Sequence, residues 1–232
     1  HSLYNEGTMS QQLATITSTL HHIVLEPEAP TGTPYPTVIM LHGLGADEHD
    51  LAGLAQFLDP RVLTISVRAL FQLEWGGYKW YDFETTGKPD PVQFKESCDR
   101  LSHFLHDALA QYPIDPHQLY LLGFSMGTVM ALAMALSQPE LFRGVMANSG
   151  YLAEETHLVY RWNDIKGKSF YVAHGVFDQI IPVQASRIIR SKLESAGARV
   201  EYHEFPMAHE IPESSLNAMA RWLTTQIDGR GD

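Results

Sequence analysis

The chain has a single cysteine, Cys98, among its 232 residues. One cysteine cannot form an internal disulfide, and it excludes a cysteine-rich metal site. Long apolar runs are also missing, because the most apolar stretch, residues 129–136, is far too short to span a bilayer. No block of basic residues occurs, and the net charge is −11. We therefore expect neither binding to nucleic acid nor stable insertion into a membrane.

The N-terminal residues lack the basic start and the continuous apolar core of a signal peptide. We therefore expect a cytoplasmic protein. The first methionine is Met9, and residues 1–8 are interpreted as a cloning remnant. Because 44% of the residues are hydrophobic, residues 9–232 are expected to form a single domain around one large core.

Apolar segments with strand and helix periodicity alternate along the chain. Strands are predicted at residues 19–25, 37–41, 62–67, 119–122, 144–147, 170–173 and 198–205. Helices are predicted at residues 47–58, 91–112, 126–136, 182–195 and 213–227. Repeated alternation within one domain predicts an α/β fold, in which helices cover both faces of a mainly parallel sheet.

A serine lies between two glycines in residues 123–127, which read Gly-Phe-Ser-Met-Gly. This G-x-S-x-G pattern is typical of a nucleophile elbow, a sharp turn that presents a serine hydroxyl at the top of a parallel sheet. The predicted apolar strand before it and the buried helix after it are the arrangement that an elbow requires. We interpret Ser125 as the candidate nucleophile.

A serine hydroxyl becomes nucleophilic when a base removes its proton, and an acid must orient that base. In a sheet of this kind the chain order is serine, acid and histidine, each in a loop after a strand. Asp178 follows the predicted strand 170–173, and His209 follows the strand 198–205. The order and the loop positions favour a Ser125–Asp178–His209 triad.

Two other residues are alternative candidates for the triad. Asp164 precedes the strand 170–173 and is therefore expected at the opposite end of the sheet. His174 directly follows that strand and is expected to support the acid loop. No histidine has neighbours at metal-ligand spacing, and no metal site is predicted.

Hydrolysis of an acyl group requires two backbone N–H groups that stabilise an oxyanion. Met126 follows the nucleophile and is expected to supply one of them. The loop 41–47 reads Leu-His-Gly-Leu-Gly-Ala-Asp and follows the strand 37–41, so Leu44 is expected to supply the other. His42 is expected to brace this loop. The loop lacks the third glycine of a dinucleotide site and the lysine of a P-loop, and no cofactor is predicted.

Five ordered motifs resemble the phospholipase/carboxylesterase family of small α/β-hydrolases, which includes bacterial carboxylesterases, lysophospholipases and acyl-protein thioesterases. They are the loop 41–47, Trp-Tyr-Asp at 80–82, Gly-Phe-Ser-Met-Gly at 123–127, His-Gly-x-x-Asp at 174–178 and Met-Ala-His-Glu at 207–210. The resemblance runs from about residue 37 to the last helix. It implies an α/β-hydrolase fold without a large lid domain, with Ser125, Asp178 and His209 as the triad.

Two positions depart from the family's pattern. Met126 stands where relatives commonly carry glutamine, and Ala208 stands where they commonly carry glycine. A backbone donor does not depend on its side chain, so we expect Met126 to keep its role. The pocket beside the serine is expected to be more apolar than in relatives.

Aromatic residues are dense after the strand 62–67. The hypothesis is that some of these aromatics line an acyl pocket, and Phe71, Trp75 and Trp80 are the candidates. The aromatic residues of this loop are Phe71, Trp75, Tyr78, Trp80, Tyr81 and Phe83. The alternative is that they only fix a long loop to the core, and the sequence does not separate the two.

The sequence therefore predicts a serine carboxylesterase that hydrolyses short- to medium-chain esters through an acyl-enzyme on Ser125. A lysophospholipase or an acyl-thioesterase would use the same triad, and a non-catalytic ligand receptor on the same fold is a remote alternative. The expected partner is a small-molecule ester. A homo-oligomer is compatible with the sequence.

Overall fold

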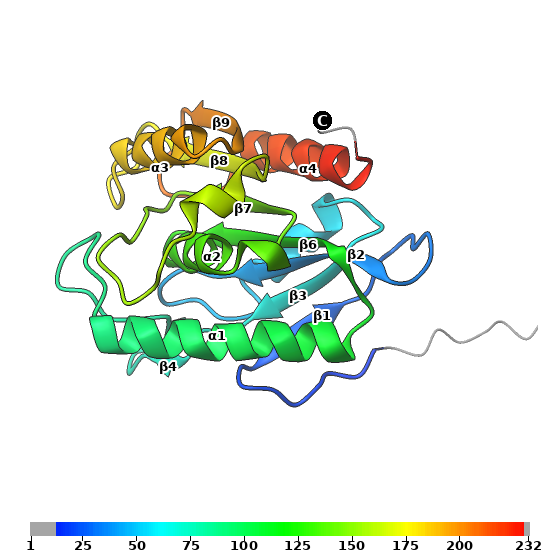
Figure 1. Ribbon diagram of the computed structural model, residues 1–232. Helices are drawn as coiled ribbons and strands as arrows, with labels where there is room; N and C mark the ends of the chain where they lie inside the picture. Colours follow the sequence, from blue (N-terminus) through cyan, green and yellow to red (C-terminus); the bar gives the residue numbers. More distant parts are fainter. Residues whose placement is uncertain (1–12, 230–232) are drawn as a thin grey trace, which may run out of the picture.

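The computed structural model describes residues 13–229. Its main feature is a seven-stranded sheet with the strand order β1-β3-β2-β6-β7-β8-β9 (Figure 1). β1 runs antiparallel to β3, and the remaining neighbours are parallel. The strands are β1 (His22–Leu25), β2 (Tyr35–Leu41), β3 (Leu63–Val67), β6 (Ile114–Phe124), β7 (Gly144–Asn148), β8 (Ser169–Gly175) and β9 (Arg199–Phe205).

Helices and a short hairpin occupy the connections between these strands. The α-helices are α1 (Pro91–Gln111), α2 (Met126–Ser137), α3 (Gln184–Ser195) and α4 (Glu213–Ile227). The 3₁₀ helices are η1 (Ala52–Phe57), η2 (Pro139–Leu141) and η3 (Trp162–Ile165), and the hairpin pairs β4 (Phe71–Gln72) with β5 (Tyr78–Lys79). Within residues 13–229, no helix is long and apolar enough to cross a membrane.

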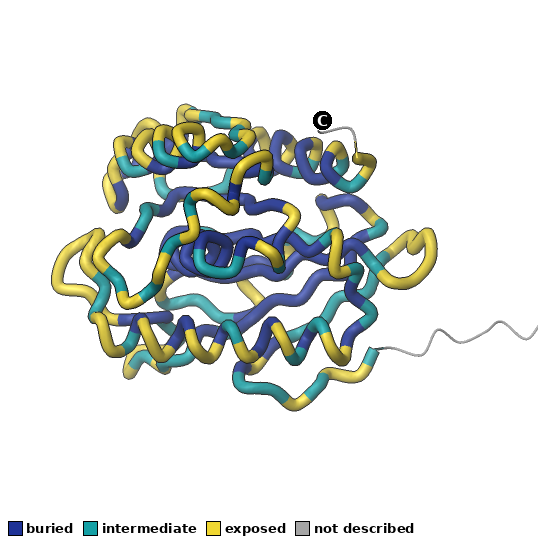
Figure 2. The backbone as a smooth tube through the Cα atoms, in the orientation of Figure 1, coloured by how far each residue is buried: buried dark blue, intermediate teal, exposed yellow. Residues whose placement is uncertain are grey.

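Each face of the sheet has its own hydrophobic core. Alternate strand residues such as Ile39 and Ile65 pack with α1, α2 and α3, whereas Val38 and Leu122 pack with η1 and α4 on the other face. Figure 2 shows that the inner strands and α2 are buried, while α1 alternates between buried and exposed positions. Burial on both faces explains why the strands are continuous apolar runs in the sequence.

The predicted α/β fold class and its seven strands are confirmed. The predicted helix 47–58 is wrong, because only η1 is helical there. The Asp47 carboxylate accepts the His49 N–H at 2.9 Å, a local turn that competes with a helix, and Gly53 weakens helix formation further. The hairpin β4–β5 was not predicted, because two-residue strands leave no periodic pattern. The interpretation of residues 1–8 concerns a segment outside the described residues.

The turn between β6 and α2 depends on the absence of a side chain at Gly127. A Cβ atom there would lie 1.8 Å from the carbonyl oxygen of Leu41, at the end of β2. The first turn of α2 therefore rests directly on the backbone of β2. This contact brings the candidate nucleophile beside the loop that follows β2.

We expect Gly127→Ala to lower the free energy of unfolding by about 2 kcal/mol or more, because backbone atoms must move apart to admit the methyl group. Gly53→Ala is the matched control, since a Cβ there meets no atom within 4 Å. Its effect should stay within about 1 kcal/mol. Urea unfolding, monitored by circular dichroism, measures the free energy of unfolding of both variants. Equal stabilities of the two variants would contradict the assigned contact.

Candidate active site

Ser125 lies at the tip of the turn between β6 and α2, with φ 55° and ψ −120°. A positive φ is unfavourable for a residue with a side chain, so the surrounding structure must maintain it. The Ser125 N–H donates to the Asn148 carbonyl at 3.0 Å, and the Thr128 hydroxyl donates to the same oxygen at 2.7 Å. The end of β7 thus anchors both sides of the turn.

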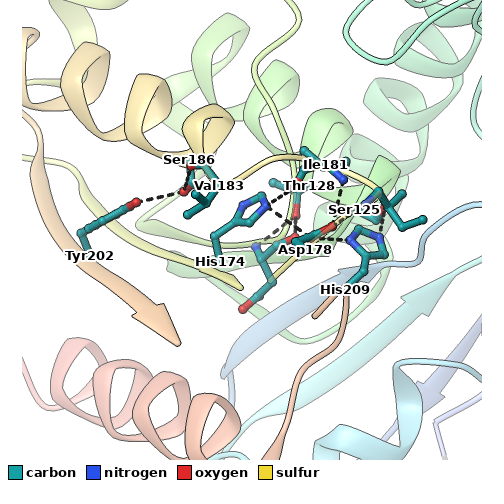
Figure 3. A network of polar contacts seen from close by, with 11 residues as sticks. Ser125, Thr128, His174, Asp178, Ile181, Val183, Ser186, Tyr202 and His209 are labelled. Atoms are coloured by element: carbon teal, nitrogen blue, oxygen red, sulfur yellow. Dashed lines mark hydrogen bonds and ion pairs between the residues drawn. The ribbon is translucent and has the colours of Figure 1, made fainter. Parts of the chain in front are cut away.

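His209 and Asp178 lie in the loops after β9 and β8, and their side chains meet Ser125 (Figure 3). The distance from Ser125 Oγ to His209 Nε2 is 2.9 Å, and His209 Nδ1 lies 2.7 Å from Asp178 Oδ2. A carboxylate can only accept, so Nδ1 carries the proton and Nε2 accepts the serine O–H. The three predicted residues therefore form one continuous hydrogen-bond chain.

The Asp178 carboxylate is fully buried, and N–H groups surround it. Its Oδ1 accepts the backbone N–H groups of Ile180 and Ile181, each at 2.9 Å. Its Oδ2 accepts from His209. These donors replace the water that burial removes, and they fix the carboxylate so that it orients the imidazole.

The loops that carry the acid and the histidine are held to each other by their backbones. Phe177 N–H donates to the Met207 carbonyl at 3.1 Å, and Val176 N–H donates to the Phe205 carbonyl at 2.9 Å. Two loops about thirty residues apart in sequence are thus joined by backbone hydrogen bonds. The spacing between Asp178 and His209 is therefore set by backbone hydrogen bonds as well as by their own contact.

His174 supports the acid loop, as the sequence predicted. Its Nε2 lies 2.7 Å from the Ile181 carbonyl and 3.3 Å from Asp178 Oδ2, two acceptors, so Nε2 carries the proton. Burial lowers the pKa of His174, which keeps the ring neutral. The competing acid Asp164 lies in η3 and pairs with Arg161, away from this network.

The loop after β2 lies against the serine, as expected for an oxyanion loop. A Cβ atom at Gly43 would lie 3.3 Å from the Ser125 Cβ atom. Among the described residues, neither the Leu44 N–H nor the Met126 N–H has an acceptor. Both predicted donors are thus free to bind a substrate oxygen.

His42 braces this loop from behind. Its Nε2 accepts the Ala69 N–H at 3.0 Å, so Nδ1 carries the proton and donates to the Gly43 carbonyl at 2.7 Å. Burial lowers the pKa of His42, and the neutral ring connects the loop after β2 to the loop after β3.

A cavity of about 530 Å³ opens at the serine, and its walls are mainly apolar. It is lined by Gly43, Leu44, Gly45, Ala46, Asp50, Tyr81, Phe83, Thr86, Phe124, Ser125, Met126, Tyr151, Ile180, Ile181 and His209. The hydroxyls of Tyr81 and Tyr151 lie 2.9 Å apart and hydrogen bond to each other. A pocket with these walls suits a small apolar acyl group.

The candidates Phe71, Trp75 and Trp80 are not among the residues that line this cavity. Phe71 belongs to the hairpin β4–β5, Trp75 is 72% exposed at its tip, and Trp80 is fully buried behind the loop after β2. The Trp75 ring lies against Gly45, where a Cβ atom would meet it at 3.1 Å. Tyr81 and Phe83 of the same loop line the cavity instead.

Tyr151 and Ile180 were missed as pocket residues. Tyr151 follows β7 and Ile180 follows Asp178, so both come after strands that end at the carboxyl edge of the sheet. That position was the available signal, because ligands of parallel sheets bind at this edge.

In the described part of the chain, Asp47, Glu48 and His49 are the one group with side chains close enough to share a metal ion. Both Glu48 oxygens already accept from Arg68, at 2.6 Å each. Burial opposes ionisation, but the Arg68 hydrogen bonds hold the pKa of Glu48 at about 2. A guanidinium therefore already neutralises the only buried carboxylate of this group.

The parallel sheet and the hydrogen-bonded serine, histidine and aspartate at its carboxyl edge define an α/β-hydrolase. Residues 22–227 match the model of the phospholipase/carboxylesterase family, and the chain belongs to that family. It is a serine hydrolase of the carboxylesterase, thioesterase or lysophospholipase type.

Two curated relatives and one solved structure illustrate the similarity. Lysophospholipase-like protein 1 of Mus musculus is 26% identical over 88% of this chain and 92% of its own length. Acyl-protein thioesterase 1 of Neurospora crassa is 26% identical over 82% of this chain and 86% of its own. The fold is similar to the Bacillus cereus carboxylesterase, with a TM-score of 0.78, 24% identity and coverage of 89% and 94%.

Burial lowers the pKa values of His22, His42 and His174. In the unfolded chain a histidine titrates near 6.5, so below that pH the unfolded state binds protons that the folded state excludes. We expect the free energy of unfolding to fall as the pH decreases from about 7 to 5. Urea unfolding at a series of pH values measures it, and a constant or rising stability toward pH 5 would contradict these environments.

Proposed function

We propose that this protein is a serine carboxylesterase that hydrolyses short- to medium-chain carboxylic esters. The observation that carries the proposal is the hydrogen-bond chain from Ser125 through His209 to Asp178 at the mouth of an apolar cavity. We assign Ser125 as nucleophile, His209 as general base and acid, and Asp178 as the residue that orients the imidazole.

In the first half of the reaction, His209 Nε2 takes the proton from Ser125 Oγ while that oxygen attacks the ester carbonyl carbon. The carbonyl oxygen of the tetrahedral intermediate becomes an oxyanion. The C–O bond to the alcohol then breaks, and the imidazolium gives its proton to the leaving alkoxide. The acyl group remains on Ser125 as an ester.

In the second half, water takes the place of the alcohol. His209 removes a proton from water as its oxygen attacks the acyl carbon, and a second tetrahedral intermediate forms. Its collapse releases the carboxylic acid and returns the proton to Ser125. Asp178 stabilises the imidazolium in both halves because the carboxylate is fixed 2.7 Å from Nδ1.

The N–H groups of Leu44 and Met126 are assigned to the oxyanion. A donor that is fixed before the reaction stabilises the developing charge without reorganising, and each is worth about 3–4 kcal/mol of barrier. Met126 is the first residue of α2, where helical N–H groups have no partner within the helix.

The pocket chemistry supports an uncharged acyl group as the substrate. Among the residues that line the cavity, Asp50 is the one carboxylate outside the triad, and lysine and arginine are missing. A free carboxylate or phosphate on the acyl chain would therefore find no counter-ion there. The substrate is a small-molecule ester, and a cytoplasmic location, a single domain for residues 9–232 and a homo-oligomer remain predictions from the sequence.

A lysophospholipase or an acyl-thioesterase is the alternative, supported by the names of the two curated relatives. All three reactions use the same serine, so a substrate panel must separate them. A non-catalytic receptor would show no turnover with any substrate of the panel.

We expect wild-type protein to hydrolyse p-nitrophenyl esters from acetate to octanoate faster than palmitate, and Ser125→Ala to lose at least about 10⁴-fold in kcat. The loss follows because water alone must then attack the ester. Lysophosphatidylcholine and an acyl thioester are assayed in parallel. Comparable turnover by Ser125→Ala would overturn the nucleophile, and preference for either parallel substrate would favour the corresponding alternative.

We expect Phe83→Ala to shift the preferred acyl chain by two or more carbons toward longer esters, because the variant enlarges the cavity at a wall residue. Phe57→Ala is the control, since Phe57 is similarly exposed but lies in η1 away from the cavity. The ratio of kcat/KM along the p-nitrophenyl series measures the shift. An unchanged ratio in Phe83→Ala would remove this residue from the acyl site.

A further inference from the structure

Trp80 is fully buried between the loop after β2 and the start of α2. Its indole Nε1–H donates to the carbonyl oxygen of His42 at 3.0 Å. His42 directly precedes Gly43 and Leu44, so this hydrogen bond acts on the backbone that carries the first oxyanion donor. The Trp80 side chain therefore holds the loop, although Trp80 is not among the residues that line the cavity.

The backbone of the same residue contacts the side chain of Met126, whose N–H is the second donor. The Trp80 N–H donates to the Met126 Sδ atom at 3.3 Å. The Trp80 carbonyl accepts the hydroxyl of Ser97, a fully buried residue of α1. One residue, anchored on a long helix, thus contacts both segments that supply the oxyanion N–H groups.

The residues before Trp80 continue this support along the loop. Gly45 N–H donates to the Tyr78 carbonyl at 2.8 Å, and Tyr78 N–H donates to the Ala46 carbonyl at 2.9 Å. A Cβ atom at Gly77 would lie 2.0 Å from the Gly45 carbonyl oxygen. Residues 77–80 therefore pack backbone against backbone on the loop after β2.

We propose that Trp80 is a positioning residue that fixes the oxyanion donors Leu44 and Met126 relative to each other. The inference rests on the proposed esterase mechanism. An oxyanion hole works only when both N–H groups lie 2.7–3.1 Å from one oxygen position, and a misplacement of about 1 Å costs up to a hundredfold in rate. The two donors belong to separate segments, and Trp80 hydrogen bonds to the His42 carbonyl oxygen in one segment and to the Met126 sulfur in the other.

A merely structural role for Trp80 predicts a different result from a positioning role. Loss of packing lowers stability and leaves the kinetics of the folded fraction unchanged. Loss of donor positioning lowers kcat while KM stays constant, because the ground-state carbonyl needs the donors much less than the oxyanion does. The experiment must therefore separate kcat, KM and stability.

The first test compares Trp80→Phe with wild type on p-nitrophenyl butyrate. Phenylalanine keeps a buried ring and removes the N–H that holds the His42 carbonyl. We expect kcat to fall about ten- to a hundredfold with KM within about twofold. Trp222→Phe is the matched control, since Trp222 is a buried tryptophan in the core on the other face of the sheet. The control should keep wild-type kcat.

A second measurement, inhibition by a transition-state analogue, tests the oxyanion hole directly. An alkyl trifluoromethyl ketone adds to the serine and forms a hemiketal whose oxyanion occupies the two donors. We expect its inhibition constant to rise in Trp80→Phe by the same factor by which kcat/KM falls. An unchanged inhibition constant would overturn the proposal, because the hole would then be intact without the indole N–H.

The link through Met126 has its own test. Met126→Leu keeps the volume and removes the sulfur, which leaves the buried Trp80 N–H without an acceptor. We expect kcat to fall several-fold in Met126→Leu. Met126→Gln restores an acceptor and should recover most of that loss. If Trp80→Phe does not fold, this pair decides the question alone, and equal kcat values for the leucine and glutamine variants would contradict the proposal.

Failure of the inference and failure of the proposed function give different results. Wild-type protein without Ser125-dependent esterase activity would contradict the proposed function. Active wild-type protein with wild-type kcat and KM in Trp80→Phe would contradict the positioning role only.

Discussion

The site depends on one close approach of backbone to backbone, where the first turn of α2 rests on the end of β2. No side chain fits at Gly127, because its Cβ atom would overlap the Leu41 carbonyl oxygen. This contact places the serine turn and the loop after β2 side by side, although the chain separates them by some eighty residues. In the proposed mechanism, this contact lets Ser125 and the N–H groups of Leu44 and Met126 act on one substrate.

The charges of the site are stabilised by fixed protein groups, which take the place of water. Asp178 is buried, yet its oxygens accept from Ile180, Ile181 and His209, with His174 nearby. His174 stays neutral, so it supports the carboxylate without competing with the charge that develops on His209. The site therefore needs little reorganisation when the imidazolium forms.

Much of the fold and of this geometry could be predicted from the sequence. Strands buried on both faces appear as apolar runs, and a turn that tolerates no side chain demands glycine, so Ser125, Asp178 and His209 follow from pattern and order. The hairpin β4–β5 could not be found, because two-residue strands have no period, and Tyr78 of β5 also pairs with Ala46 in a distant loop. The sequence therefore does not separate Tyr81 and Phe83, which line the cavity, from the other aromatics of residues 71–83, which do not.

In the proposed mechanism, the reaction rate and the acyl-chain selectivity depend on different residues. Residues at the mouth, such as Phe83 and Ile180, contact the space that an acyl chain would fill. Trp80 lies behind the loop and contacts only protein, through His42, Met126 and Ser97. In this mechanism, a substitution at the mouth of the cavity alters which acyl chains fit. A substitution of Trp80, behind the loop after β2, alters the rate with every acyl chain.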